Sequence, residues 1–402
     1  MSNNKLRLKH LVSVHNGYGF PVEFQGDKGT IPFYKVSDMN TIGNEKYLVN
    51  SNNYVTEELC KSKNWKLVPA GSIILPKIGA ALLTNKRRMT SQPCLIDNNC
   101  CALIPVDMNQ GEWIYNSVLN IDSGDFCQSG AVPALKMGDF LLSEISLPND
   151  RENLLITLES KLSLVDSSIG NLTQKLHHLE EYKTALIHNA VTKGLDANGN
   201  EITNSEWKSR SVKSLFHTAT RGKNCTYSDN DNENLIITQS CLLQDNTLDV
   251  SKGKFEVNSP SGEKFHLSNG DILISSSGVK NTIGKVAYIE GINKTTIANW
   301  DVMRLCTNTD MHSKYTYYLL ITMRNHIKEY CLRGATGQEH LIADFFNEST
   351  VCVPKVADQE TISKFLDIEV TNLNIIKKKI NKKIALLLEY KKSLINEAVS
   401  GQ

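Results

Sequence analysis

The sequence lacks an excess of charge of either sign. Its 402 residues carry 44 lysines and arginines against 43 aspartates and glutamates, a formal net charge of +1. This balance excludes a strongly basic clamp around nucleic acid. If the chain binds DNA, its basic groups must be arranged locally, or a partner must supply much of the contact to the phosphates.

The sequence also lacks paired cysteines and apolar targeting segments. Its ten cysteines are scattered without a Cys-x-x-Cys pair, and Cys100 and Cys101 are merely adjacent. The first residues contain no apolar leader, and no apolar run approaches the length that spans a membrane. We therefore expect a cytoplasmic protein with reduced thiols that pack as small apolar side chains.

Enzyme motifs are absent or only approximate. The segment Gly278 to Val286 resembles a phosphate-binding loop, but it has one residue too many between its glycines and Val286 where Ser or Thr must reach magnesium. It is better interpreted as a turn between strands. The sequence contains no His-Glu-x-x-His, no Gly-x-Ser-x-Gly and no amino-methyltransferase motif. We expect no catalytic residue, no bound cofactor and no metal on this chain.

What the sequence contains instead is a long apolar seam. Between residues 155 and 190 apolar side chains recur at alternating steps of three and four, which is the heptad pattern of a coiled coil, and only Lys183 interrupts it. The stretch ends in Glu181-Tyr182-Lys183, and a second seam near the C-terminus ends in Glu389-Tyr390-Lys391. The residues that we expect to form the coiled coil and its docking surface are Leu155, Leu158, Leu162, Leu172, Leu176, Leu179, Tyr182, Leu186, Leu366, Leu373, Ile380, Ile384, Leu387, Tyr390 and Leu394.

The two seams belong to a larger internal repeat with a period of about 200 residues, far longer than a solenoid repeat. The repeated unit is a whole domain followed by a helix. The matching pairs are Lys5-x-Arg7 with Lys208-x-Arg210, Gly71 with Gly270, Gly79 with Gly278, and Asp139-Phe140 with Asp344-Phe345.

These patterns predict a mixed α/β (α+β) fold with two globular domains and two long helices. Short apolar runs such as 72–75, 101–105 and 271–275 predict strands, and Gly, Asn, Asp and Pro turns separate them. The expected boundaries are a first domain at 1–147, a helix at 148–194, a polar linker at 195–206, a second domain at 207–353 and a C-terminal helix at 354–402.

A single heptad seam cannot bury itself, so we expect the two helices to pair within the chain as an antiparallel coiled coil. About 40 residues at 1.5 Å per residue make a rod of roughly 60 Å. Two similar domains related by a pseudo-twofold axis suit the reading of two half-sites on duplex DNA. The same geometry suits a scaffold that joins two proteins, and the repeat alone does not decide between them.

Basic residues near predicted turns are the candidates for DNA contact, because Lys and Arg bind phosphates and arginine reads guanine in the major groove. For any single one of them, ordinary solvated surface charge is the commoner explanation. The candidates are Lys77, Lys86, Arg87 and Arg88 in the first domain and Arg221, Lys223, Lys280 and Lys285 in the second.

The layout resembles the specificity subunit of a type I restriction–modification system. The resembling segments are Gly334-Ala-Thr-Gly337-Gln338, Pro354-x-x-x-Asp358-Gln359-Glu360-x-Ile362, and the ending Glu-Tyr-Lys-x-x-Leu-Ile-x-x-Ala-Val, which occurs twice. Asp358 stands where the family usually has glutamate, and the first helix entry lacks the glutamine.

The resemblance implies a non-catalytic subunit with two target-recognition domains, each of which reads one half of a split DNA target. Two modification subunits, which use S-adenosylmethionine to methylate adenine N6, would dock on the repeated helices. ATP-driven restriction (translocase) subunits, with their ATP and Mg²⁺, would join them. The coiled coil would then act as a ruler between half-sites, with a gap of roughly 5–8 base pairs.

Overall fold

The structure is a computed structural model that describes residues 4–128, 130, 132–196, 198–202, 206–229, 234–256, 265–279, 282–292, 294–333, 338–342 and 344–400. Lys280 and the segment from Gly334 to Gly337 lie outside these residues. The chain divides into two compact units, the first made of residues 1–172 and 381–402 and the second of residues 173–380. No helix in the described part of the chain is long and apolar enough to cross a membrane.

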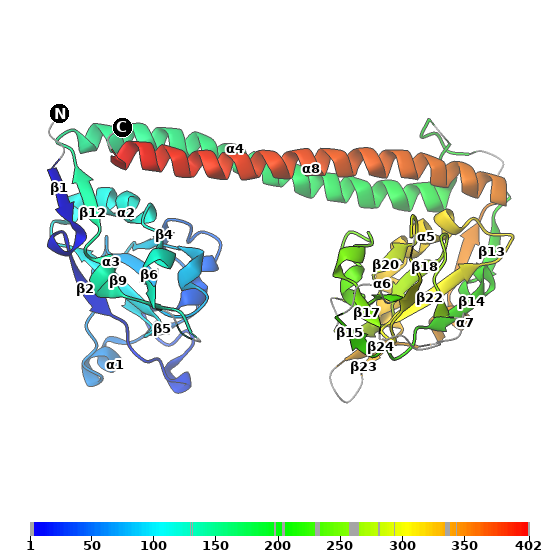
Figure 1. Cartoon of the computed structure of the whole chain (residues 1–402), viewed down its shortest axis with the longest axis horizontal. Coiled ribbons are helices and arrows are strands. Elements are labelled where there is room, and N and C mark those ends of the chain that lie inside the picture. The colour runs from blue at the N-terminus through cyan, green and yellow to red at the C-terminus, as the bar shows by residue number, and fades with distance from the viewer. Residues whose placement is uncertain are drawn as a thin grey trace. The chain divides into compact units, whose positions relative to one another are not determined.

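The first unit is built around a five-stranded sheet in the order β2-β9-β6-β7-β4 (Figure 1). Its strands β6 and β9 are buried and mostly apolar, as the sequence predicted. The strands are β2 (Val12–Asn16), β4 (Tyr47–Leu48), β6 (Ile73–Pro76), β7 (Arg88–Thr90) and β9 (Cys100–Pro105). A smaller sheet has the order β5-β3-β8, formed by β3 (Ile31–Tyr34), β5 (Tyr54–Val55) and β8 (Leu95–Ile96).

The second unit repeats this plan with a four-stranded sheet in the order β14-β22-β18-β20. Ile272 faces Leu305 in this sheet just as Ile73 faces Leu103 in the first one. The strands are β14 (Phe216–Arg221), β18 (Ile272–Ser275), β20 (Val286–Tyr288) and β22 (Val302–Thr307). Its second sheet includes the parallel pair β16 (Asn234–Ile237) and β21 (Thr296–Ala298), which corresponds to the parallel pair β3 and β8.

A glycine in each unit allows two chain segments to approach closely. A Cβ atom on Gly17 would lie 1.9 Å from the carbonyl oxygen of Asp97, and one on Gly222 would lie 2.1 Å from that of Ala298. Both glycines follow the first strand of the main sheet, β2 or β14. The turn that ends this strand therefore requires glycine in both copies of the domain.

In each unit a helix follows one strand of the main sheet, β9 in the first unit and β22 in the second. This helix connects the sheet to the two long helices of the chain. The connecting helix is α2 (Gly111–Leu119) in the first unit and α5 (Ser313–Thr322) in the second. The long helices are α4 (Arg151–Asn189), which continues as one π-helical turn (Ala190–Gly194), and α8 (Val356–Ser400). Each long helix contributes to both units.

The two long helices pack antiparallel, as expected (Figure 1). In the first unit, Leu158 and Val165 of α4 pack with Leu394 and Ile395 of α8. In the second unit, Glu180 of α4 pairs with Lys377, and Lys183 contacts Asn374. The seam is thus apolar for most of its length and polar at a few matched places.

The helices also complete the core of each unit. Val399, near the end of α8, belongs to the core cluster that contains Trp113 and Phe140 in the first unit. Ile187 of α4 and Val191 of the π-helical turn after it join the core of the second unit together with Ile362 of α8. Each domain is therefore built onto its own part of the helix pair.

Candidate nucleic-acid interface

In each unit, the main sheet has one end next to the helix pair and one end away from it. Strand β9 ends at Pro105 and leads to α2, whose Leu119 packs against the helix pair, so its first residue, Cys100, lies at the far end. In the second unit, β22 leads toward α5, where Tyr315 donates its hydroxyl to the carbonyl of Val191 at 3.0 Å. The far end of this sheet is where β22 begins, at Val302.

One predicted basic residue of the first unit lies at this far end. Lys77 directly follows β6, and its Nζ atom donates to Oδ1 of Asn16 at 2.8 Å. Asn16 ends β2 and faces Cys101 across the sheet. Lys77 is half-buried and Asn16 is exposed, so the pair presents a hydrogen-bond donor and an acceptor close together at the surface.

The cluster Lys86, Arg87 and Arg88 divides into different environments. Arg87 is fully buried and donates to Oδ1 of Asn85 at 2.8 Å and to Oγ of Ser123 at 2.6 Å. Burial lowers the pKa of Arg87 to about 10. Arg88 is half-buried and donates to the carbonyl of Met39 at 2.8 Å. Of the three, Arg87 is therefore enclosed within the domain, where it supports the fold and is not accessible to a DNA duplex.

The second unit brings two predicted residues together with a tryptophan that sequence reasoning missed. Arg221 ends β14 and donates Nη2 to the carbonyl of Leu341 at 2.9 Å. Its guanidinium lies 5.3 Å from the ring centroid of Trp300, which is 47% exposed. Lys223, two residues later, pairs with the buried carboxylate of Glu256 at 2.5 Å. All of these residues lie at the far end of the sheet.

Lys285 does not join this group. It is buried, and its Nζ donates to the carbonyl of Gln239 at 2.9 Å and to that of Leu242. Burial lowers the pKa of this lysine. The segment that resembles a phosphate loop lies between β19 (Ser277–Gly278) and β20, as expected for a turn between strands, although its residues 280 and 281 are not described.

The predicted seam residues are buried or half-buried along both helices, with two exceptions. Tyr182 and Tyr390, which occupy the same place in the two repeats, are 54% and 52% exposed. The lysine that follows each tyrosine turns to the opposite helix instead. Lys183 donates to Oδ1 of Asn374 at 3.2 Å, and Lys391 contacts both carboxylate oxygens of Asp166 at 2.6 and 2.8 Å.

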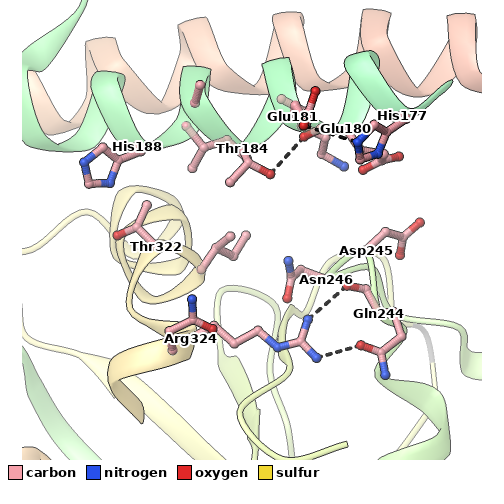
Figure 2. Close-up of a pocket in the computed structure, with 15 residues that line it drawn as sticks. His177, Glu180, Glu181, Thr184, His188, Gln244, Asp245, Asn246, Thr322 and Arg324 are labelled. Carbon is pink, nitrogen blue, oxygen red and sulfur yellow. Dashed lines mark hydrogen bonds and ion pairs between the residues drawn. The ribbon is translucent and has the colours of Figure 1, made fainter. Parts of the chain in front are cut away.

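A cavity of about 710 Å³ lies beside α4 in the second unit (Figure 2). Figure 2 shows His177, Thr184 and His188 on α4, and across from them Gln244 and Arg324, which belong to two separate segments of the chain. Arg324 is tied to Gln244 by hydrogen bonds of 2.6 and 3.2 Å. No group of three metal-ligating side chains occurs among the described residues, so this cavity has no recognisable metal site there.

Comparison with known proteins agrees with this architecture. Residues 204–386 match the family model of the type I restriction modification DNA specificity domain. The chain is 24% identical over 198 residues to a putative type I restriction enzyme MjaX specificity subunit of Methanocaldococcus jannaschii. The match covers 48% of the chain and 45% of that relative, so it spans about half the relative's length.

A solved structure shows the same fold. A chain of a type I R-M system, whose structure concerns complex assembly and conformational transition, has a TM-score of 0.71 at 11% identity and covers 98% of this chain and 97% of its own. The crystal structure of a type-I restriction-modification system S subunit from M. genitalium has a TM-score of 0.42 at 13% identity, with 99% and 96% covered.

Proposed function

The chain belongs to the type I restriction–modification specificity subunits, a non-catalytic family, and from this premise we propose that it directs a modification complex to a split DNA sequence. Each globular domain would read one half of the target. The main support is the duplicated topology, in which each copy of the domain is built onto its own part of an antiparallel helix pair.

In the second domain, we propose that Arg221, Lys223 and Trp300 contact DNA. Arg221 is held between the ring of Trp300 and the carbonyl of Leu341, so its guanidinium is pre-oriented. An arginine held in this way is suited to the paired acceptors of guanine in the major groove. In the first domain, Lys77 and Lys86 are the corresponding candidates, with Arg88 beside them. Arg87 and Lys285 are too deeply buried to take this role without rearrangement.

The repeated helices would dock two copies of an adenine-N6 methyltransferase (modification) subunit, one on each copy. The exposed Tyr182 and Tyr390 lie at equivalent places on these helices and suit two equivalent contacts. S-adenosylmethionine would be held by the methyltransferase, and ATP and Mg²⁺ by restriction (translocase) subunits. The target adenine would be flipped into the partner's pocket. Partner subunits would also supply phosphate contacts, which accounts for the nearly neutral charge of this chain. The complex would act in the cytoplasm, where the chromosome lies.

The helix pair would set the gap between the two half-sites. A continuous α-helix rises 1.5 Å per residue and resists bending over its length, so it is suited to fix a distance. The proposed domain boundaries are those expected from the sequence, with recognition domains at 1–147 and 207–353, helices at 148–194 and 354–402, and a linker at 195–206.

Single-molecule sequencing of modified bases in the source genome, with and without the gene, tests the proposal. The expected result is a split motif that carries methyladenine on both strands and disappears on deletion. If a methyltransferase complex containing this chain binds no DNA sequence preferentially, the chain is instead a coiled-coil scaffold that joins two proteins.

A further inference from the structure

In the first unit, a lysine of the globular domain lies between two carboxylates, one of which belongs to the helix pair. The Nζ atom of Lys46, just before β4, is 2.9 Å from Oε2 of Glu112 in α2 and 3.1 Å from Oε1 of Glu159 in α4. The hydroxyl of Tyr47 also donates to Glu112. Lys46 therefore connects the edge of the sheet, α2 and α4.

The second unit contains the same kind of bridge. Nζ of Lys314 in α5 is 2.9 Å from Oε2 of Glu290 and 3.7 Å from Oδ1 of Asp367 in α8. Tyr318 donates its hydroxyl to the same Oδ1 atom at 2.6 Å. Lys314 is also held over the ring of Tyr288, 4.2 Å from its centroid.

The two helix carboxylates occupy the same position in the internal repeat. Glu159 follows Leu158, and Asp367 follows Leu366, and these leucines lie equally far before the two Glu-Tyr-Lys endings. The lysines are not equivalent, because one precedes a strand and the other lies in a helix. The two domains thus reach the same helix position by different local structures.

A hollow adjoins each bridge. The cavity in the first unit measures about 570 Å³ and is lined on the helix side by Glu159, Leu162, Ser163 and Asp166 of α4. The cavity in the second unit measures about 580 Å³ and is lined by the equivalent helix residues Asp367, Val370, Thr371 and Asn374. Close packing resists rotation of one element against another, and a hollow does not. Beside these hollows, the ion pairs of Lys46 and Lys314 are the contacts that resist rotation of the domain against the helix.

We propose that Lys46 and Lys314 are positioning residues that hold each recognition domain at a fixed angle on its helices and thereby restrict the gap between half-sites. The part about the gap rests on the proposed function. Burial acts to lower the pKa of Lys46, but Glu112 and Glu159 outweigh it and hold this pKa above its ordinary value. The Lys46 bridge therefore remains charged at neutral pH.

The variants for the test are Lys46→Met and Lys314→Met, because methionine keeps much of the apolar stem and removes the charge. Lys46→Arg is the conservative variant that keeps it. Lys161→Met, at an exposed position of α4, is the matched control.

The first measurement uses the full chain without DNA. Two spin labels, introduced through non-canonical amino acids because ten native cysteines are present, report the distance between domain and helix within one unit. Lys46→Met should broaden this distance distribution in the first unit and leave that of the second unit unchanged, and Lys314→Met should do the reverse. Lys46→Arg, which keeps the charge, should give a distribution as narrow as that of the wild type. Distributions as narrow as in the wild type for both methionine variants would overturn the proposal, whatever the protein does with DNA.

The second measurement uses the assembled methyltransferase complex and targets whose gap is one base pair shorter or longer than the native one. The preference for the native gap should fall by about threefold or more in the double variant, the order expected from loss of partly exposed ion pairs. A broadened distribution with an unchanged preference would overturn the role in gap selection. A wild-type complex that binds no split sequence would refute the proposed function and with it the gap role, while the spin-label result still decides whether the bridges hold the domains.

Discussion

Basic side chains that are neighbours in the sequence lie in different environments in this protein. Lys86, Arg87 and Arg88 are consecutive, yet Arg87 is fully buried and its neighbours are half-buried. The Arg87 guanidinium satisfies Asn85, Ser123 and the carbonyl of Ile121. A buried charge is tolerated only with such partners, and the partners in turn depend on it.

Arg87→Met should therefore lower the free energy of unfolding by about 2–4 kcal/mol, because it leaves several buried acceptors without a donor. Urea unfolding followed by circular dichroism measures this loss. Lys86→Met is the neighbouring control and should change stability by no more than about 0.5 kcal/mol. Equal, small effects of both substitutions would show that Arg87 does not support the fold.

Arg221→Met should weaken binding of the assembled complex to its target by about 1–3 kcal/mol, the usual value of a bidentate contact to guanine. Trp300→Ala should weaken it in the same direction, because the ring orients the guanidinium. Binding is measured by fluorescence anisotropy with DNA in which each half-site is changed in turn, and only the half-site of the second domain should become less specific.

Lys213→Met is the control for these two variants. Lys213 is exposed and precedes β14, whereas Arg221 ends that strand, so the two lie at opposite ends of it. A loss of affinity as large in Lys213→Met as in Arg221→Met would mean that charge anywhere on the domain matters, and not the far end of the sheet.

At the scale of the helices, equivalent lysines have different partners. Lys391 makes an ion pair with Asp166, whose side chain is half-exposed. Lys183 is only 8% exposed and meets the neutral Asn374. Desolvation lowers the pKa of Lys183, and the nearby Glu180 and Asp245 only partly oppose this effect.

Substitution by methionine should therefore lower the free energy of unfolding at Lys391 but not at Lys183. Lys391→Met should lower the free energy of unfolding by up to about 1 kcal/mol, the value of a surface ion pair. Lys183→Met should leave it unchanged or raise it by about 1 kcal/mol, because a desolvated charge is replaced by an apolar side chain. Urea unfolding of both variants measures the difference, and a loss of equal size at both positions would contradict this account.

The difference in stability between Lys183→Met and the wild type should also depend on pH. Because folding lowers the pKa of Lys183, the unfolded chain binds its proton more tightly than the folded chain does. The cost of the buried charge is present at neutral pH and disappears as pH rises through the folded pKa toward the ordinary value of 10.5. The gain in stability of Lys183→Met over the wild type should therefore shrink toward that pH.

At the scale of the whole molecule, both long helices cross from one compact unit to the other. Inserting one heptad in each helix, after Leu172 and after Ile380, keeps the seam in phase and lengthens each helix by about 10 Å. If the helices set the gap, the methylated motif should gain about three unread base pairs, at 3.4 Å per step. Sequencing of modified bases reads the new gap directly, and an unchanged gap would refute the ruler.

The long helices and the duplicated plan could be predicted from the sequence because both are local or periodic patterns. A heptad seam repeats every seven residues, and a match such as Gly71 with Gly270 is visible without coordinates. Apolar runs such as 72–75 and 271–275 likewise predicted β6 and β18, because central strands are buried on both faces.

The antiparallel pairing was expected from the repeat, and the structure confirms it. Which basic side chains are accessible was decided only by the tertiary structure. Arg87 and Lys285 look like Lys77 and Arg221 in the sequence, but burial depends on segments that are distant along the chain, such as Ser123 and Gln239. The contacts of Arg221 with Trp300 and of Lys46 with Glu159 were also decided by the tertiary structure, because each joins residues that are far apart in the sequence. Periodicity identifies an element and its apolar face, whereas the contacts of one polar side chain depend on how distant elements pack.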